Sequence, residues 1–188
     1  MAVYHLAKGA RPLNIGEFLD PALLPTDCQV AAVVGDTLDP ENGLETNGIR
    51  SYTMWGEIGA QLGRKAWKVL ADSDAQRTAP GKVTLQEAVG TRPTVIIIDE
   101  IAQSLRQLAS SGNPDTRRLG EALPAFLKNL SELASGSPNV VVIITLATRA
   151  DAYGKETNEL EDLLNELGGT FATTLADADD VPQARVTR

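Results

Sequence analysis

Two adjacent carboxylates stand out in the sequence because they directly follow an uninterrupted apolar segment. Asp99 and Glu100 come after residues 94–98, Thr-Val-Ile-Ile-Ile, which have the composition of a buried parallel strand. In open parallel sheets, ligands bind beyond the carboxyl ends of the strands, so this pair is placed to do chemistry. An aspartate at such a strand end can hold Mg²⁺ on nucleotide phosphates, and a glutamate beside it can accept a proton from an attacking water.

This pattern is typical of the Walker B motif of P-loop ATPases that carry a catalytic glutamate. It predicts that Asp99 binds Mg²⁺ and the nucleotide cofactor ATP, and that Glu100 is the catalytic base. The alternative is that both carboxylates form only the solvated rim of a sheet, with Asp99 capping the helix that follows.

A second candidate group of polar residues follows the next apolar segment, residues 140–146. ATPases of this kind place a polar sensor at the end of this strand, so we expect Thr145 to contact the γ-phosphate. Arg149 could contact a phosphate of its own subunit or of a neighbouring one. The alternatives are a Thr145 hydroxyl bonded to a nearby backbone group and a solvated Arg149.

The sequence has no glycine-rich phosphate loop of the form G-x-x-x-x-G-K-S/T. Its two Gly-Lys pairs, Gly81-Lys82 and Gly154-Lys155, lack both the upstream glycine and the hydroxyl residue. Such a loop normally joins the first strand to the first helix, whereas residues 2–8 read as an uncapped helix with no strand before it. We therefore expect a fragment that starts just after its own phosphate loop and does not hydrolyse ATP by itself.

The order of the predicted elements indicates an α/β fold, with a mainly parallel sheet and crossover helices. It matches a P-loop NTPase (AAA+-like) core that lacks its first strand and phosphate loop. We expect a partial ATPase domain over residues 1–176 and a polar tail over 177–188. Without a first strand beside it, the strand at 140–146 would be an exposed edge, so we expect self-association into a homo-oligomer. We expect strands at 29–34, 94–98 and 140–146, a loop at 36–50, and a polar connection at 71–93 with a helical turn at 84–89. The expected helices are a long one that Thr53 caps and that runs through Leu70, one at 100–109, one that Asn113-Pro114 begins, and one from Thr157. The inner face of the helix after Asn113-Pro114 is expected to consist of Leu119, Leu123, Phe126, Leu127, Leu130 and Leu133.

Two segments resemble an AAA+-like ATPase family that is catalogued only as a domain of unknown function, number 499 in that series. Met1 to Gly9, MAVYHLAKG, is similar to the helix after the family's glycine-rich loop, and Thr53-Met54-Trp55-Gly56-Glu57-Ile58 is similar to its Trp-Gly-Glu helix. The resemblance implies a large multidomain ATPase, often encoded beside DNA methyltransferases and helicases in defence-type gene clusters. The implied partners are ATP, Mg²⁺, the rest of the polypeptide, and DNA or DNA-modifying enzymes.

Composition excludes several other classes of protein. The 188 residues include 17 Lys and Arg against 25 Asp and Glu, a net charge of −8 that argues against a broad basic surface for nucleic acid or membrane. Cys28 and His5 are the only residues of their kinds, which excludes an internal disulfide, Cys-rich zinc sites and multi-histidine metal sites. With no membrane-spanning segment or signal peptide in the sequence, we expect a cytoplasmic location and no membrane partner.

Two further functions compete with an ATP-hydrolysing motor or switch domain. One is a non-enzymatic α/β interaction module without nucleotide chemistry. The other is a receiver-like domain that uses Asp36 and Asp99 to hold Mg²⁺, which is disfavoured because no acidic pair ends the first strand.

Overall fold

A three-stranded parallel sheet forms the centre of the computed structural model, which describes residues 2–9, 20, 22 and 27–145. The strand order is β1-β4-β5, and Gln29, Thr94 and Val140 share one level of the register. The strands are rich in Val and Ile, and they bury one face of the sheet under a layer of helices, whereas alternate residues of the central strand are only half-buried. The α/β class and all three expected strands are therefore confirmed. Their bounds are β1 Gln29–Val34, β4 Thr94–Asp99 and β5 Val140–Ile144.

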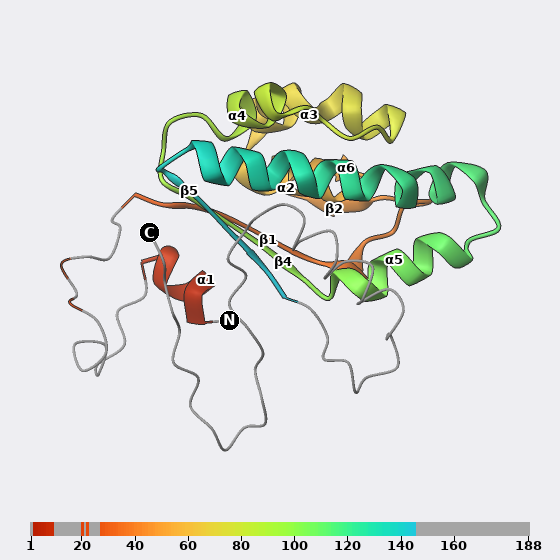
Figure 1. Ribbon diagram of the computed structural model, residues 1–188, viewed down its shortest axis with the longest axis horizontal. Helices are drawn as coiled ribbons and strands as arrows, with labels where there is room; N and C mark the ends of the chain where they lie inside the picture. The colour runs from red at the N-terminus through yellow and green to blue at the C-terminus, as the bar shows by residue number, and fades with distance from the viewer. Residues whose placement is uncertain (1, 10–19, 21, 23–26, 146–188) are drawn as a thin grey trace, which may run out of the picture.

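Helices lie on both sides of this sheet (Figure 1). The long helix α6 and helix α2 cover one face, α3 and α4 form a further layer outside them, and α1 lies on the opposite side. Asn113 caps α6 as expected, because its side chain accepts a hydrogen bond from the Asp115 amide at 2.9 Å. The helices are α1 Ala2–Ala7, α2 Met54–Leu62, α3 Arg64–Gln76, α4 Lys82–Val89, α5 Ile101–Ser110 and α6 Pro114–Gly136.

The hydrophobic core lies between α6, α2 and the sheet. Six residues at helical spacing form the buried face of α6, and they pack with Trp55 of α2 and with Ile96 and Ile98 of β4. This heptad-like spacing is the expected signature of a helix that buries one stripe. The six are Leu119, Leu123, Phe126, Leu127, Leu130 and Leu133.

The expected single long helix after Thr53 is wrong, since α2 and α3 are separate helices. Thr53 does cap α2, accepting from the Gly56 amide at 2.9 Å, but the helix ends at Gly63. Gly63 has a φ of 112°, which is incompatible with a continuing helix. The chain then turns back, so that a Cβ on Gly59 would lie 3.2 Å from the Trp67 Cα.

Two predicted connections contain regular structure. The segment 36–50 holds the end of a 3₁₀ turn, Gly35–Thr37, and a hairpin of β2, Leu44–Thr46, and β3, Ile49–Ser51. Asn47 and Gly48 join these strands with φ of 54° and 70°, as a tight hairpin turn requires. A three-residue strand is too short for its alternation of apolar and polar residues to be recognised in the sequence. The connection at 71–93 is likewise mostly helical, because it contains the end of α3 and all of α4.

The remaining sequence expectations differ in small ways or cannot be compared. Asp99 closes β4, so α5 begins one residue later than predicted, and β5 ends at Ile144. Arg149, the helix expected from Thr157 and the tail at 177–188 lie outside the described residues. Within the part of the chain that is described, no helix has the length and apolar character needed to cross a membrane.

Candidate functional site

The structure brings Asp99 and Thr145 together at the carboxyl end of the sheet. Thr145 follows β5, and its amide donates to the Ile98 carbonyl at 2.9 Å, which continues the pairing of β4 with β5. Its hydroxyl donates to Asp99 Oδ1. The alternative for Thr145 was a hydroxyl bonded to a backbone group. The structure instead shows a hydrogen bond from this hydroxyl to a carboxylate.

The Asp99 carboxylate has one oxygen engaged and one available. Oδ1 also accepts from the Glu100 amide at 3.0 Å, whereas Oδ2 has no hydrogen-bond partner among the residues that the structure describes. No side chain caps α5, so Asp99 is not the cap that the alternative required. A half-buried carboxylate with a free oxygen is a suitable ligand for a hard cation.

The donor set around Asp99 fits Mg²⁺ only with additional ligands. In residues 27–145 and the short described segments before them, no three His, Cys, Asp or Glu side chains gather into a metal site. Mg²⁺ commonly keeps several waters and takes one or two carboxylates together with substrate phosphates. Asp99 would therefore hold the ion jointly with phosphate oxygens and water.

Glu100 occupies an unusual backbone position between the strand and α5. Its φ and ψ are 55° and 36°, the left-handed region, which costs a non-glycine residue roughly 1 kcal/mol. Its side chain is exposed, and its carboxylate has no partner within the described part of the chain. Strained residues of this type cluster at functional sites, and no local sequence signal indicated this conformation.

Gly35 allows the turn at Glu100 to pack against the end of β1. A Cβ at Gly35 would lie 2.4 Å from the Glu100 carbonyl oxygen and 2.9 Å from the Ser104 Cβ. Only glycine fits between these groups, since a real Cβ atom does not approach that closely. The backbone at Glu100 therefore packs directly against Gly35, the first residue after β1.

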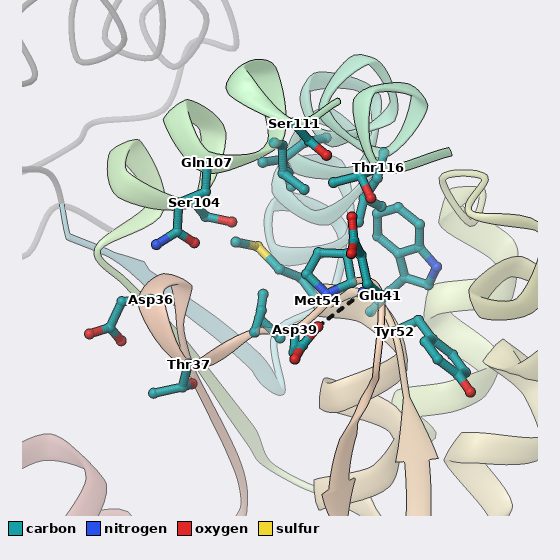
Figure 2. A pocket seen from close by; sticks show the side chains of 16 residues that line it. Asp36, Thr37, Asp39, Glu41, Tyr52, Met54, Ser104, Gln107, Ser111 and Thr116 are labelled. Atoms are coloured by element: carbon teal, nitrogen blue, oxygen red, sulfur yellow. Dashed lines mark hydrogen bonds between the residues drawn. The ribbon is translucent and has the colours of Figure 1, made fainter. Parts of the chain in front are cut away.

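A cleft of about 570 Å³ lies beside this turn, between the segment after β1 and helices α5 and α6 (Figure 2). Asp36 lies at its rim, and Ser104, one turn beyond Glu100, lies in its wall. The sequence did not indicate this cleft, because its walls combine residues 36–55 with residues 104–123, two stretches that are distant in the chain.

The Trp-Gly-Glu segment of α2 is buried and has a packing role. Trp55 is fully buried, and its ring centroid lies 5.2 Å from that of Phe126. A Cβ on Gly56 would lie 2.0 Å from Asp74 Oδ1, so α3 approaches α2 at this glycine. Glu57 is 2% exposed.

Glu57 connects α2 to the hairpin through hydrogen bonds. Its carboxylate accepts from Thr46 Oγ1 at 2.8 Å, from Ser51 Oγ at 2.9 Å and from Gln61 Nε2 at 2.8 Å. The Gln61 side chain in turn accepts from the Ala32 amide and donates to the Ala32 carbonyl, both at 2.7 Å. These two bonds occupy part of the outer edge of β1. A buried carboxylate is tolerated here because several donors satisfy it.

Asp74 anchors the beginning of α2 from α3. Its Oδ1 accepts from the amides of Tyr52 and Thr53 at 3.0 and 2.9 Å, and from Thr53 Oγ1 at 2.7 Å. Burial raises the pKa of the Asp74 carboxyl above its ordinary value, although these donors oppose the change.

Comparison with known proteins links the chain to one family. A model of the DUF499 N-terminal domain matches residues 9–169. No curated protein and no solved structure matches the chain significantly.

Proposed function

The chain belongs to the DUF499 N-terminal domain family, and we propose that it forms the Walker B and sensor portions of an AAA+-like, ATP-hydrolysing motor or switch domain. The observation that carries the proposal is the meeting of Asp99 and Thr145 at the ends of adjacent parallel strands. The family description names no activity, so the proposal rests on the geometry of these residues.

The strand order supports this assignment. In the proposed core, β1, β4 and β5 are the second, third and fourth strands, and β4 lies between the other two. This order places the candidate Walker B strand directly beside the candidate sensor strand. The proposed ATPase also needs a glycine-rich phosphate loop, which residues 1–188 do not contain.

The role proposed for each side chain follows from its hydrogen bonds and its exposure. Asp99 Oδ2 has no competing donor in the described residues and would bind Mg²⁺, which when present neutralises charge on the phosphates of ATP. Glu100 is exposed and unpaired in the same part of the chain, so its carboxylate can orient a water and accept its proton. Arg149 is retained as a candidate phosphate contact.

The Thr145 hydroxyl has two alternative acceptors in the proposed site, the Asp99 carboxylate and a γ-phosphate oxygen. Its hydroxyl has one proton, which is donated to Asp99 in this structure. Donating to a γ-phosphate oxygen would therefore require release of Asp99. We expect this exchange to couple phosphate contact at β5 to the carboxylate on β4.

The proposed partners are ATP with Mg²⁺ and the rest of the same polypeptide, with DNA or DNA-modifying enzymes as further partners in the cytoplasm. A non-enzymatic interaction module is the second candidate function. It is favoured by the cleft of about 570 Å³, which has an apolar floor and does not depend on a nucleotide.

The decisive variant is Glu100→Gln in a polypeptide that includes the upstream phosphate loop. We expect Mg-ATP binding, measured by a fluorescent ATP analogue, to be retained, and steady-state hydrolysis to fall by roughly 10²–10⁴-fold because the base is lost. Glu132→Gln, an exposed glutamate on α6, is the matched control and should hydrolyse ATP normally. Undiminished hydrolysis in Glu100→Gln would exclude the proposed role, and absence of ATP binding in the longer polypeptide would favour the interaction module.

A further inference from the structure

The cleft beside the candidate site has an apolar floor. It opens between the segment 36–41, which follows β1, and the helices α5 and α6, and its volume of about 570 Å³ is within the ordinary range for ligand pockets. Figure 2 shows Asp36 and Asp39 on one side, Ser104 and Ser111 on the other, and Met54 between them. The apolar residues in the lining include Leu38, Met54, Trp55, Leu108, Leu119 and Leu123.

One side of the cleft is acidic. Asp36, Asp39 and Glu41 line it and are exposed, and its described lining contains no Lys or Arg. The carboxylates of Asp36 and Glu41 have no hydrogen-bond or ion-pair partner in the described chain, so their charge is available to a ligand. This arrangement repels phosphate groups and attracts cations.

Asp39 contributes charge and also shapes the acidic segment. Its carboxylate accepts from the amides of Glu41 and Asn42 at 3.1 and 2.9 Å and from Asn42 Nδ2 at 2.9 Å. The Asn42 donors lower the pKa of this carboxyl below its ordinary value. The segment is therefore held in one conformation with its negative charge retained.

Three arginines that bond to backbone carbonyls in or beside the cleft form no ion pair with Asp36, Asp39 or Glu41 in the described residues. Arg77 Nη2 donates to the Pro40 carbonyl at 3.0 Å, and its guanidinium lies 5.2 Å from the centroid of the Tyr52 ring. Arg117 donates to the Ser111 carbonyl at 3.2 Å. Arg50 Nη1 donates to the Asn42 carbonyl at 2.8 Å, and its Nη2 pairs with Glu45 at 3.4 Å.

We propose that this cleft binds an extended peptide segment of a partner protein that carries an arginine or lysine next to an apolar side chain. The basic group pairs with an exposed carboxylate of the acidic segment, Asp36 or Glu41, and the apolar side chain enters the floor near Leu108 and Leu119. Gln107, exposed on α5, presents an amide that can bond the peptide backbone. This inference needs no nucleotide and stands independently of the proposed ATPase.

The test is selection of a random dodecapeptide phage library on the complete chain, followed by fluorescence anisotropy of the enriched peptides. We expect sequences with Arg or Lys beside Leu, Ile, Met or Phe, and affinity that falls as the salt concentration rises. The double variant Asp36→Asn with Glu41→Gln should weaken binding at least tenfold. The double variant Asp72→Asn with Glu132→Gln removes the same charge from exposed sites outside the lining and should stay within twofold of the parent.

A steric variant separates the cleft from general electrostatics. Gln107→Trp fills the space from an exposed position, so it should abolish binding while leaving urea unfolding unchanged. Failure to enrich basic peptides, or equal affinity in the Asp36 and Glu41 variant, overturns the proposal. Concentration-dependent dimerisation in ultracentrifugation that Gln107→Trp abolishes would also overturn it, because a second copy would then be the occupant.

Discussion

The Thr145 hydroxyl donates a hydrogen bond to Asp99 Oδ1 across two adjacent strand ends, 46 residues apart in the chain. This bond fixes one oxygen of the candidate Mg²⁺ ligand and leaves the other without a partner in the described structure. The pair is therefore both a structural contact and the centre of the proposed site.

Replacing Thr145 by valine tests the structural part of this relationship. Valine keeps the shape of the side chain but removes the donor, so we expect the free energy of unfolding in urea to fall by about 1–2 kcal/mol. Thr145→Ser retains the hydroxyl and should recover most of that loss. Identical stability of the valine variant and the parent would show that this bond contributes nothing to folding.

Replacing Glu100 by glycine tests the backbone strain at the same site. Glycine adopts the left-handed conformation freely, so we expect the free energy of unfolding to rise by about 0.5–1 kcal/mol despite the added entropy of the unfolded chain. Glu132→Gly makes the same chemical change inside α6 and should lower stability by about 1 kcal/mol. A loss of stability in Glu100→Gly would mean that the glutamate side chain stabilises the fold.

Replacing Gly56 by alanine tests the close approach of α3 to α2. The added methyl group would lie 2.0 Å from Asp74 Oδ1, so Asp74 must move and its bonds to Thr53 must weaken. We expect a loss of about 1–3 kcal/mol in chemical unfolding. Gly112→Ala, where a Cβ meets no atom within 4 Å, is the control and should change stability by less than about 0.5 kcal/mol.

The buried carboxyl of Asp74 predicts a pH dependence of stability. Burial raises its pKa in the folded state above the ordinary value of 3.8, so its contribution is full below that value and is lost as the pH rises through the folded pKa. Asp74→Asn keeps an acceptor oxygen but cannot ionise. We expect the stability of the parent relative to Asp74→Asn to decrease as the pH rises from about 4 towards neutrality, measured by urea titrations across that range. A relative stability that increases with pH would show that the hydrogen bonds outweigh burial.

The local chemistry of the chain was sufficient to predict the main strands and the candidate carboxylates. The strand from Gln29 to Val34 was predicted residue for residue, and Asp99 was placed at a strand end, because short apolar runs between turn signals leave few alternatives. The cap at Thr53 and the apolar stripe of α6 were equally local signals. The Trp-Gly-Glu segment correctly indicated the family.

Tertiary structure alone decided the arrangement of the site. The Thr145–Asp99 bond, the left-handed Glu100 above Gly35, and the cleft between segment 36–41 and α5 all join residues that are distant in sequence or depend on packing between elements. The break at Gly63 also depends on packing, since its positive φ is maintained where α3 folds back on α2. Periodicity and capping act over a few residues, whereas side-chain pairing and backbone strain are determined by which distant segments the fold brings into contact.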